Sequence, residues 1–396
     1  FRRFPHFWWL RGPGADVNSR MKRAFSSAFY LVVILVAAFM SQPLSAQTQQ
    51  VDEKELREWA DRGDADAQFE LGLRMITGEG VKKNLAEGVK SIEKAAKQKH
   101  LRAQHILGTL HEDGIGVKKD LAKAAEWYKT SADLGFALSQ SSLAVLYEEG
   151  KGVKKDPAKA AEWFKKAADQ NHPPSQTAYA SKLERGDGVT KSTAKAALWY
   201  LKAAQQDWVP AMTRLANLYY TGQGVPVDYR RAGAWYQRAA RSEDPWAANN
   251  LAWFLATCPE ENLHNGETAV LLARRALKLV AEAAQSDEQP YEMIDTMAAA
   301  LARNGEFKEA ELWQQRSLIM LKEDRDLPQD DQQKLKDEFE TRLNLYQKAT
   351  PFAEPEPKGE EEAEPLPQDT ILQDEDMPES KPRNKTAPKS SRGTVV

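Results

Sequence analysis

Residues 137–172 read ALSQSSLAVLYEEGKGVKKDPAKAAEWFKKAADQNH, and this stretch decides the fold. Leu143 and Tyr147 belong to one apolar stripe, because residues four positions apart share a face of a helix. Gly150 ends that helix, since glycine adopts a positive φ without a steric penalty. Asp156 then suits the cap of a second helix, where its side chain can accept from free N–H groups. The stretch therefore predicts two helices joined by a glycine loop.

The Gly-x-Gly-Val signature of this loop recurs at a fixed step of 36 residues, beginning at Gly78, Gly114, Gly150, Gly186 and Gly222. An aromatic pair such as Trp163-Phe164 keeps the same register, although the first unit has Ser91-Ile92 instead. Self-similarity at such a period is typical of a solenoid, whose units pack on their neighbours. We therefore predict an all-α array rather than the two or three domains that 396 residues would otherwise suggest.

The repeated unit resembles the Sel1-like repeat, a relative of the tetratricopeptide repeat. The matching positions of the second unit are Ala103, Leu107, Gly108, Gly114, Gly116, Val117, Asp120, Lys123, Ala124, Trp127, Tyr128 and Ala132. In the fourth unit Ser192 replaces the capping aspartate. The resemblance covers five repeats over residues 65–244 and implies a right-handed α/α superhelical solenoid. Residues 51–64 are expected to form an N-terminal capping helix, because terminal repeats need a polar outer face.

Helical patterns continue beyond residue 244, although the period breaks. Residues 246–257 align with a first helix that Cys258-Pro259 ends, and four further patterns cover residues 267–284, 291–303, 306–321 and 329–348. The stretch from Asp295 to Trp313 resembles an ordinary tetratricopeptide unit. We predict that residues 245–348 form tetratricopeptide-like helices and a C-terminal cap.

The two ends of the chain differ in composition from the repeats. Residues 21–46 have the basic start, the apolar core Ala28–Met40 and the small-residue cleavage site of a secretory signal peptide, and residues 1–20 are interpreted as an upstream extension. This predicts an exported, periplasmic protein, with an inner-membrane anchor through Ala28–Met40 as the alternative. Residues 351–396 hold eight prolines and eleven acidic residues, which predicts a disordered acidic tail.

Several classes of function are excluded by composition and motifs. A formal net charge of −3 argues against a nucleic-acid partner, and a single cysteine removes disulfides and Cys-based zinc sites. No HExxH, GxSxG or P-loop motif occurs, and His105 and His111 are six residues apart, unlike a metal-binding pair at i and i+4. We therefore predict no catalytic residue, metal or cofactor. The alternative is a cell-wall or β-lactam-directed hydrolase, which the resemblance implies only for secreted relatives with a cysteine pair in each repeat.

Lysines recur in the loops between the two helices of the repeats. They are Lys82, Lys83, Lys118, Lys119, Lys154, Lys155 and Lys191. Stacking of the repeats would align them along one basic edge, which could bind an acidic partner strip or, weakly, anionic lipid headgroups. The alternative is that these loops are only solvated.

Superhelical repeats of this type resemble one another in binding partners on the concave face of their first helices. The corresponding positions here are Phe69, Leu73, Ile76, His105, Thr109, Glu112, Ser141, Val145, Glu148, Thr177, Ser181, Glu184, Thr213, Asn217, Tyr220, Asn249 and Trp253. They change from apolar residues, through small hydroxyls beside a glutamate row, to an amide and aromatic patch. Such a face is suited to binding an extended peptide. The alternative is that these residues only contact solvent and bind no partner.

Taken together, these patterns predict a non-catalytic scaffold for protein–protein interaction. We expect it to bind a peptide or protein segment of an envelope-located partner on the concave face.

Overall fold

The structure, a computed structural model, describes residues 52–284, 289–357, 359 and 366. These residues form α-helices and one short 3-10 helix, without a strand, and none of their helices has the length and apolar character needed to cross a membrane. They fall into two compact units, one reaching to Val227 and including Gly359 and Leu366, the other comprising Asp228–Pro357. The predicted signal peptide, with its alternative as an anchor, lies outside the described residues.

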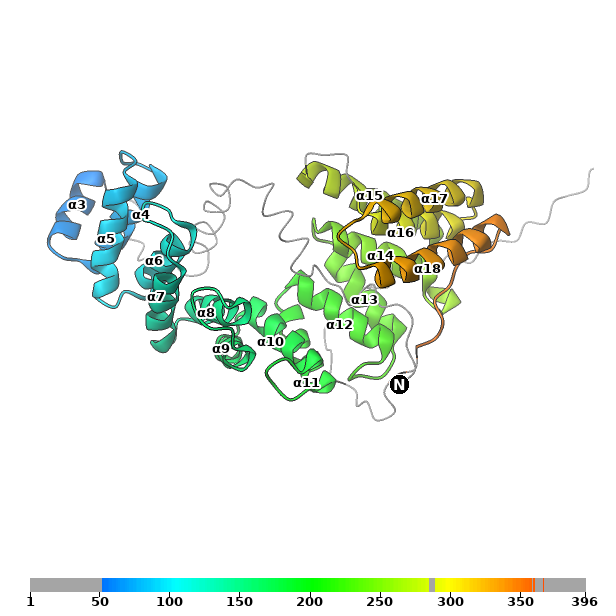
Figure 1. Cartoon of the computed structure of the whole chain (residues 1–396), viewed down its shortest axis with the longest axis horizontal. Helices are drawn as coiled ribbons and strands as arrows, with labels where there is room; N and C mark the ends of the chain where they lie inside the picture. The colour runs from blue at the N-terminus through cyan, green and yellow to red at the C-terminus, as the bar shows by residue number, and fades with distance from the viewer. Residues whose placement is uncertain (1–51, 285–288, 358, 360–365, 367–396) are drawn as a thin grey trace, which may run out of the picture. The chain divides into compact units, whose positions relative to one another are not determined.

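Helices alternate regularly along the first unit. After α3 (Glu53–Asp61), the first helices of the repeats are α4 (Ala65–Thr77), α6 (Leu101–Asp113), α8 (Ala137–Glu149), α10 (Pro173–Arg185) and α12 (Val209–Thr221). The second helices are α5 (Leu85–Lys97), α7 (Leu121–Asp133), α9 (Pro157–Asp169) and α11 (Thr193–Ala204). Figure 1 shows these helix pairs following one another in chain order. The predicted all-α solenoid of helix pairs is confirmed.

The second unit continues with pairs of helices of less regular length. Its elements are α13 (Tyr229–Ala240), α14 (Pro245–Thr257), η2 (Glu261–Leu263), α15 (Gly266–Ala284), α16 (Tyr291–Arg303), α17 (Phe307–Glu323) and α18 (Gln329–Gln347). Helices α14 and α15 pack together, as do α16 and α17. The helical patterns expected beyond residue 244 nearly coincide with α14 to α18, whereas η2 lies in a stretch expected to be a loop.

Hydrophobic clusters of the first unit straddle neighbouring repeats. One cluster joins Phe69 and Ile92 of the first repeat to Leu107 of the second. The next joins Tyr128 of the second repeat to Leu143 of the third. Because these clusters are shared between repeats, each repeat depends on its neighbours to bury its apolar side chains, as expected for a solenoid.

Side-chain caps begin the second helices, as the sequence predicts. Asp120, Asp156 and Asp228 each accept a hydrogen bond from the backbone N–H three residues further on, at 2.9–3.0 Å. Ser192 replaces the aspartate in the fourth repeat and accepts from the Lys195 N–H at 3.3 Å. The substitution therefore preserves the cap, because a hydroxyl oxygen also satisfies a free donor of the first turn.

The two glycines of each repeat loop have different structural roles. Gly186 ends α10 in the left-handed conformation, with φ 76°, and donates to the Lys182 carbonyl at 2.8 Å. Gly188 instead lies against the preceding repeat, where an added Cβ would come within 2.3 Å of the Pro157 carbonyl oxygen. Gly80 has a similar φ of 68°, but no described atom lies within 4 Å of its Cβ position. The second glycine therefore permits the close approach of consecutive repeats.

Buried glutamines also link consecutive repeats. Each donates its amide at 2.9–3.2 Å to a carbonyl in the last turn of the preceding helix, and the set recurs every 36 residues as Gln68, Gln104, Gln140 and Gln176. Unbonded carbonyls at a helix end need such partners. The sequence analysis missed these residues, although their spacing equals that of the glycines.

A second set of glutamines is hydrogen-bonded to the first set in three of the repeats, and we call the two sets together the glutamine ladder. Their amides donate to the oxygen of the first set at 2.8–2.9 Å, in the pairs Gln98–Gln68, Gln170–Gln140 and Gln206–Gln176. In the second repeat the corresponding residue is Leu134, which is 48% exposed. The Gln104 side-chain oxygen is accordingly buried without a partner among the described residues.

Substitution of the two glycines by alanine should have unequal effects. Both changes place a side chain at a left-handed φ, which costs about 1–2 kcal/mol. Only Gly188→Ala also forces a methyl group against the backbone at Pro157, and such overpacking adds about 1–3 kcal/mol. We therefore expect G188A to lower the free energy of unfolding more than G80A, as measured by urea unfolding. Equal losses would show that this contact does not control repeat packing.

Leu134→Gln should stabilise the protein, because it supplies the donor that the Gln104 oxygen lacks. The expected gain in the free energy of unfolding is about 0.5–1.5 kcal/mol, the net contribution of one hydrogen bond. Leu134→Ala is the matched control, since it removes the same exposed side chain without adding a donor. Equal stability of L134Q and L134A in urea unfolding would contradict the assignment of the ladder.

Candidate functional site

The residues predicted to bind a partner all lie on first helices, and we call these positions the first-helix face. The structure divides them by exposure. Buried members are Phe69, Leu73, Ile76, His105, Thr109, Asn217, Tyr220, Asn249 and Trp253. Half-buried or exposed members are Glu112, Ser141, Val145, Glu148, Thr177, Ser181, Glu184 and Thr213. The accessible members therefore cluster in α6, α8, α10 and α12.

Phe69 and Leu73 are core residues rather than parts of a binding surface. Both belong to the cluster that also contains Ile76 and Ile92, and they are among its buried members. The Phe69 ring additionally stacks on His100, with the ring centroids 4.7 Å apart. The same cluster includes Leu107 of α6, so these side chains of α4 help to join the first repeat to the second.

His105 is enclosed by aromatic side chains and has a structural role. Its ring centroid lies 5.3 Å from that of Tyr128 and 5.7 Å from that of Phe136, and its Nδ1 atom is 3.1 Å from the Ser139 hydroxyl. Burial lowers the pKa of His105 to about 4, with a smaller contribution from the charge of His172. The imidazole is therefore neutral at physiological pH.

Two glutamates of the first-helix face are hydrogen-bonded to tyrosines of the second helices. The Tyr128 hydroxyl donates to Glu112 at 2.8 Å, and the Tyr200 hydroxyl donates to Glu184 at 2.8 Å. Burial raises the pKa of Glu112, and the hydrogen bond from Tyr128 opposes that shift. Each tyrosine thus combines packing between the helices with a fixed orientation of the carboxylate at the face.

The third repeat has Phe164 in place of this tyrosine, so its glutamate finds another partner. Glu148 accepts from the Lys182 ammonium at 3.1 Å, and Asp187 accepts from the same ammonium at 2.9 Å. Lys182 is fully buried, whereas both carboxylates are partly exposed. The glutamate row is therefore organised by contacts within the chain in all three of these repeats.

A short accessible strip precedes the glutamates of the first-helix face along α8 and α10. We call Ser141, Val145, Thr177 and Ser181 the hydroxyl strip. Val145 is 38% exposed, and the other three side chains are half-buried. The Thr177 hydroxyl donates to the Pro173 carbonyl at 3.0 Å and keeps its lone pairs as acceptors. The strip offers small donors and acceptors around one apolar side chain.

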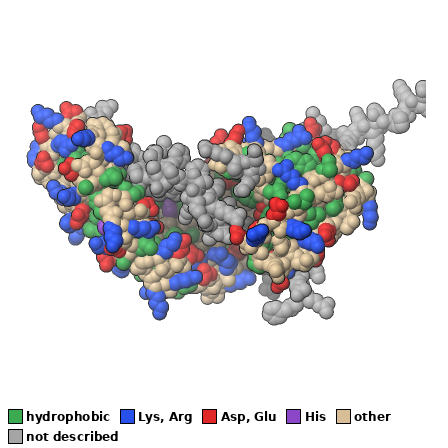
Figure 2. All heavy atoms as spheres, turned by 45° about the horizontal axis from the view of Figure 1, so that its top comes forward, with side chains coloured by type: hydrophobic (Ala, Val, Ile, Leu, Met, Phe, Trp, Pro, Cys, Tyr) green, Lys and Arg blue, Asp and Glu red, His purple; other side chains and the backbone are tan. Residues whose placement is uncertain are grey.

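All seven lysines of the predicted basic edge are exposed. Some of them also pack against the loop, because an added Cβ at Gly114 or Gly150 would lie 3.0 or 3.1 Å from the Cβ of Lys119 or Lys155. The second lysine of each pair therefore covers the capping glycine with its aliphatic stem. On the face drawn in Figure 2, basic and acidic side chains alternate over the described surface without a large area of one sign.

In the second unit, the first-helix residue Trp253 lies against a segment that was expected to be disordered. Residues 351–357 pack on this unit, and the ring centroids of Trp253 and Phe352 are 6.2 Å apart. Ordered packing therefore extends beyond Pro351. The rest of the predicted tail lies outside the described residues, except for Gly359 and Leu366.

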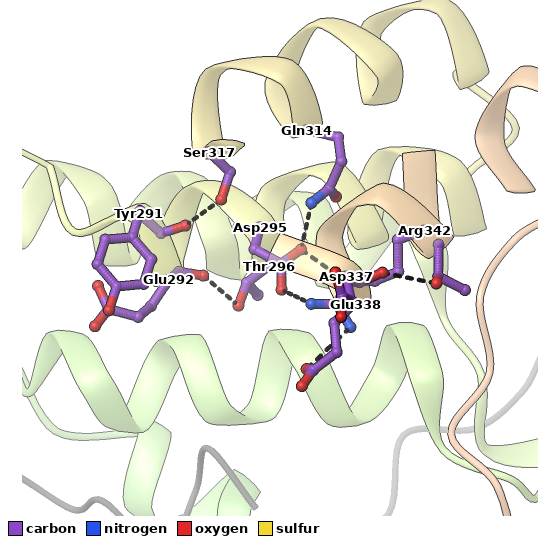
Figure 3. A network of polar contacts seen from close by, with 10 residues as sticks. Tyr291, Glu292, Asp295, Thr296, Gln314, Ser317, Asp337, Glu338 and Arg342 are labelled. Carbon is purple, nitrogen blue, oxygen red and sulfur yellow. Dashed lines mark hydrogen bonds and ion pairs between the residues drawn. The ribbon is translucent and has the colours of Figure 1, made fainter. Parts of the chain in front are cut away.

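A buried ion pair organises the helices beneath this segment (Figure 3). Asp295 of α16 accepts from Arg342 of α18 at 2.9 and 3.0 Å, and from Gln314 of α17 at 2.9 Å. Burial raises the pKa of Asp295, and the charge of Arg342 opposes that shift. An acidic residue within the apolar stretch of α16 was the sequence signal for a buried partner.

The environment of Cys258 disfavours a role as a nucleophile. Cys258 is buried, and burial raises the pKa of its thiol to about 12, which disfavours the nucleophilic thiolate. The described part of the chain contains no group of three or more side chains of the types that ligate metals.

The helix pairs, shared clusters and first-helix face define the class of this protein as an α-helical repeat solenoid. The Sel1 repeat model matches residues 65–100, 101–136, 137–172, 173–208 and 209–244. Residues 65–244 therefore consist of five consecutive Sel1 repeats. Proteins with Sel1 repeats generally mediate protein–protein interactions.

Two solved structures illustrate the likeness. One is a protective antigen with an SLR fold, present in uropathogenic Escherichia coli strains; it is 24% identical, covers 76% of each chain and has a TM-score of 0.56. The other is a Sel1 repeat protein from Oxalobacter formigenes, 26% identical over 59% of this chain and 92% of that one, with a TM-score of 0.51. No curated protein sequence matches this chain.

Acidification should destabilise the protein in part through His105. Because the pKa of about 4 in the folded state lies below the ordinary value of 6.5, the unfolded state binds more protons between these values, and stability falls as the pH falls. Between pH 7 and pH 5 we expect the His105→Gln variant to lose about 2 kcal/mol less than the wild type. Urea unfolding at both pH values measures this difference. Parallel pH dependences would contradict the buried, neutral assignment.

Proposed function

We propose that this protein is a non-catalytic scaffold that binds an extended peptide segment on the hydroxyl strip. The observation that carries the proposal is the accessibility of Val145 beside half-buried hydroxyls on two consecutive first helices. An extended peptide presents backbone donors and acceptors on both sides and side chains at alternate positions. Hydroxyls can pair with that backbone: a serine hydroxyl can both donate and accept, and the Thr177 hydroxyl, which donates to the Pro173 carbonyl, can still accept from a peptide N–H.

Preorganisation supports this assignment. The glutamates beside the strip are already oriented by Tyr128, Lys182 and Tyr200, so their geometry need not be created on binding. Ordering side chains at an interface costs about 0.5–1.5 kcal/mol for each immobilised group, and a face fixed in advance avoids part of that cost. The half-buried carboxylates also favour a partner segment that carries positive charge next to its bound residues.

The proposal also includes the compartment in which the protein acts. The signal-peptide pattern of residues 21–46 supports export to the periplasm, and an envelope-located protein is then the expected partner. The exposed lysines of the basic edge supply a second surface, suited to an acidic strip of the partner or to weak contact with anionic lipids. No observation in the described residues favours the hydrolase alternative.

Val145→Glu should impair partner capture, because it places a charge at the apolar centre of the strip beside existing carboxylates. Leu198→Glu is a matched control, since Leu198 is also 38% exposed but lies on the second helix α11. Crosslinking capture from native envelopes should recover at least about tenfold less partner with V145E, corresponding to about 1.4 kcal/mol, and unchanged amounts with L198E. Circular dichroism should show equal helicity. Undiminished capture by V145E would remove the hydroxyl strip from the proposal.

A further inference from the structure

Residues 351–357 form a short segment that returns onto the second unit directly after α18. Ala349 adopts a positive φ of 52°, and the Thr350 N–H donates to the Leu345 carbonyl at 2.9 Å, which reverses the chain. The segment reads PFAEPEP, and its prolines favour an extended backbone in the residues that precede them. It is thus conformationally restricted before any contact is made.

Two backbone contacts hold the segment at the ends of neighbouring helices. Arg303, the last residue of α16, donates from Nη2 to the Phe352 carbonyl at 2.7 Å. The Glu354 N–H donates to the carbonyl of Thr257, the last residue of α14, at 2.7 Å. Both contacts use main-chain atoms of the segment, so they are available to any extended peptide.

Aromatic contacts select the side chain at position 352. The Phe352 ring lies beside Trp253, and the Arg342 guanidinium carbon is 5.3 Å from the Phe352 ring centroid and 5.4 Å from that of Trp253. A guanidinium at these distances attracts the faces of aromatic rings. Because Asp295 holds Arg342 in two hydrogen bonds, the aromatic site is oriented independently of the segment.

The carboxyl group of Glu354 lies in a charged setting built from three helices. Trp253 of α14, Asp295 of α16, and Glu338 and Arg342 of α18 are the groups that interact with it. Burial raises the pKa of Glu354 to about 7, Arg342 opposes this shift, and Asp295 adds to it. Arg342 thus lies near three carboxyl groups, and a bound glutamate is about half protonated at pH 7.

We propose that the surface formed by Trp253, Thr257, Arg303 and Arg342 is a binding site for partner peptides with an aromatic-x-Glu sequence, which residues 351–357 occupy as a tethered competitor. The site lies wholly within the second unit and does not rest on the function proposed for the hydroxyl strip. A tether of a few residues gives the internal segment a local concentration in the millimolar range or above. A partner peptide therefore binds when the internal segment is weakened or displaced.

The test uses a fluorescently labelled peptide, TPFAEPEP, and the full-length protein. Anisotropy titration should show at least about tenfold tighter binding to the double variant F352A/E354A than to the wild type, because the variant keeps the site but weakens the competitor. The peptide TPAAEPEP should bind neither protein measurably, and this control does not depend on the folding of a further variant. Equal binding of TPFAEPEP to both proteins, or binding to neither, would overturn the proposal.

A second measurement examines the glutamate. With F352A/E354A, the peptide TPFAEPEP should bind about tenfold tighter at pH 6 than at pH 8, because a pKa raised to about 7 in the bound state favours the protonated form. The peptide TPFAQPEP should bind with nearly equal affinity at both values. If the two peptides have the same pH dependence, the glutamate is not recognised at this site.

Discussion

The close contact between consecutive repeats is the constraint on which the rest of the structure depends. At Gly188 the backbone approaches the beginning of α9 so closely that no Cβ fits, and at Gly224 the same is true for the beginning of α11. Alongside this contact, each second helix packs against the first helix of the next repeat, as in the cluster that joins Tyr128 of α7 to Leu143 of α8. Without it, each helix pair would expose the apolar surface that its neighbour now covers.

Much of the fold was predictable because glycine, proline and capping residues act locally. The left-handed φ at Gly186 and the cap at Ser192 depend on positions a few residues away, and a single sequence contains those. The glutamine ladder also left a periodic trace, but its purpose became evident only when the partners across repeats were known. Contacts such as that between Asp295 and Arg342 join residues 47 positions apart and have no such trace.

The candidate site was harder to predict than the fold, because position on a helix does not determine exposure. Phe69 and Val145 both occupy predicted binding positions, yet the first is buried in the core and the second is exposed. Equivalent positions differ in the same way: Thr109 is buried and Ser181 is half-buried, although the second helices of both repeats carry a tyrosine at the same position. Exposure therefore depends on the three-dimensional packing around each position, which the pattern of one helix does not contain. The packing of residues 351–357 was not predicted, because the composition of residues 351–396 is an average and does not distinguish the first few residues from the rest.

The gap in the glutamine ladder has a consequence for how the array opens. In a one-dimensional array, stability is the sum of the repeats and of the interfaces between neighbours, so the weakest link decides where one cooperative segment ends and the next begins. The buried Gln104 oxygen has no described partner, so the second repeat lacks the bond that the ladder supplies within the first, third and fourth repeats. Hydrogen exchange by local opening is therefore expected to be faster at the end of α7 than at the ends of α5 and α9.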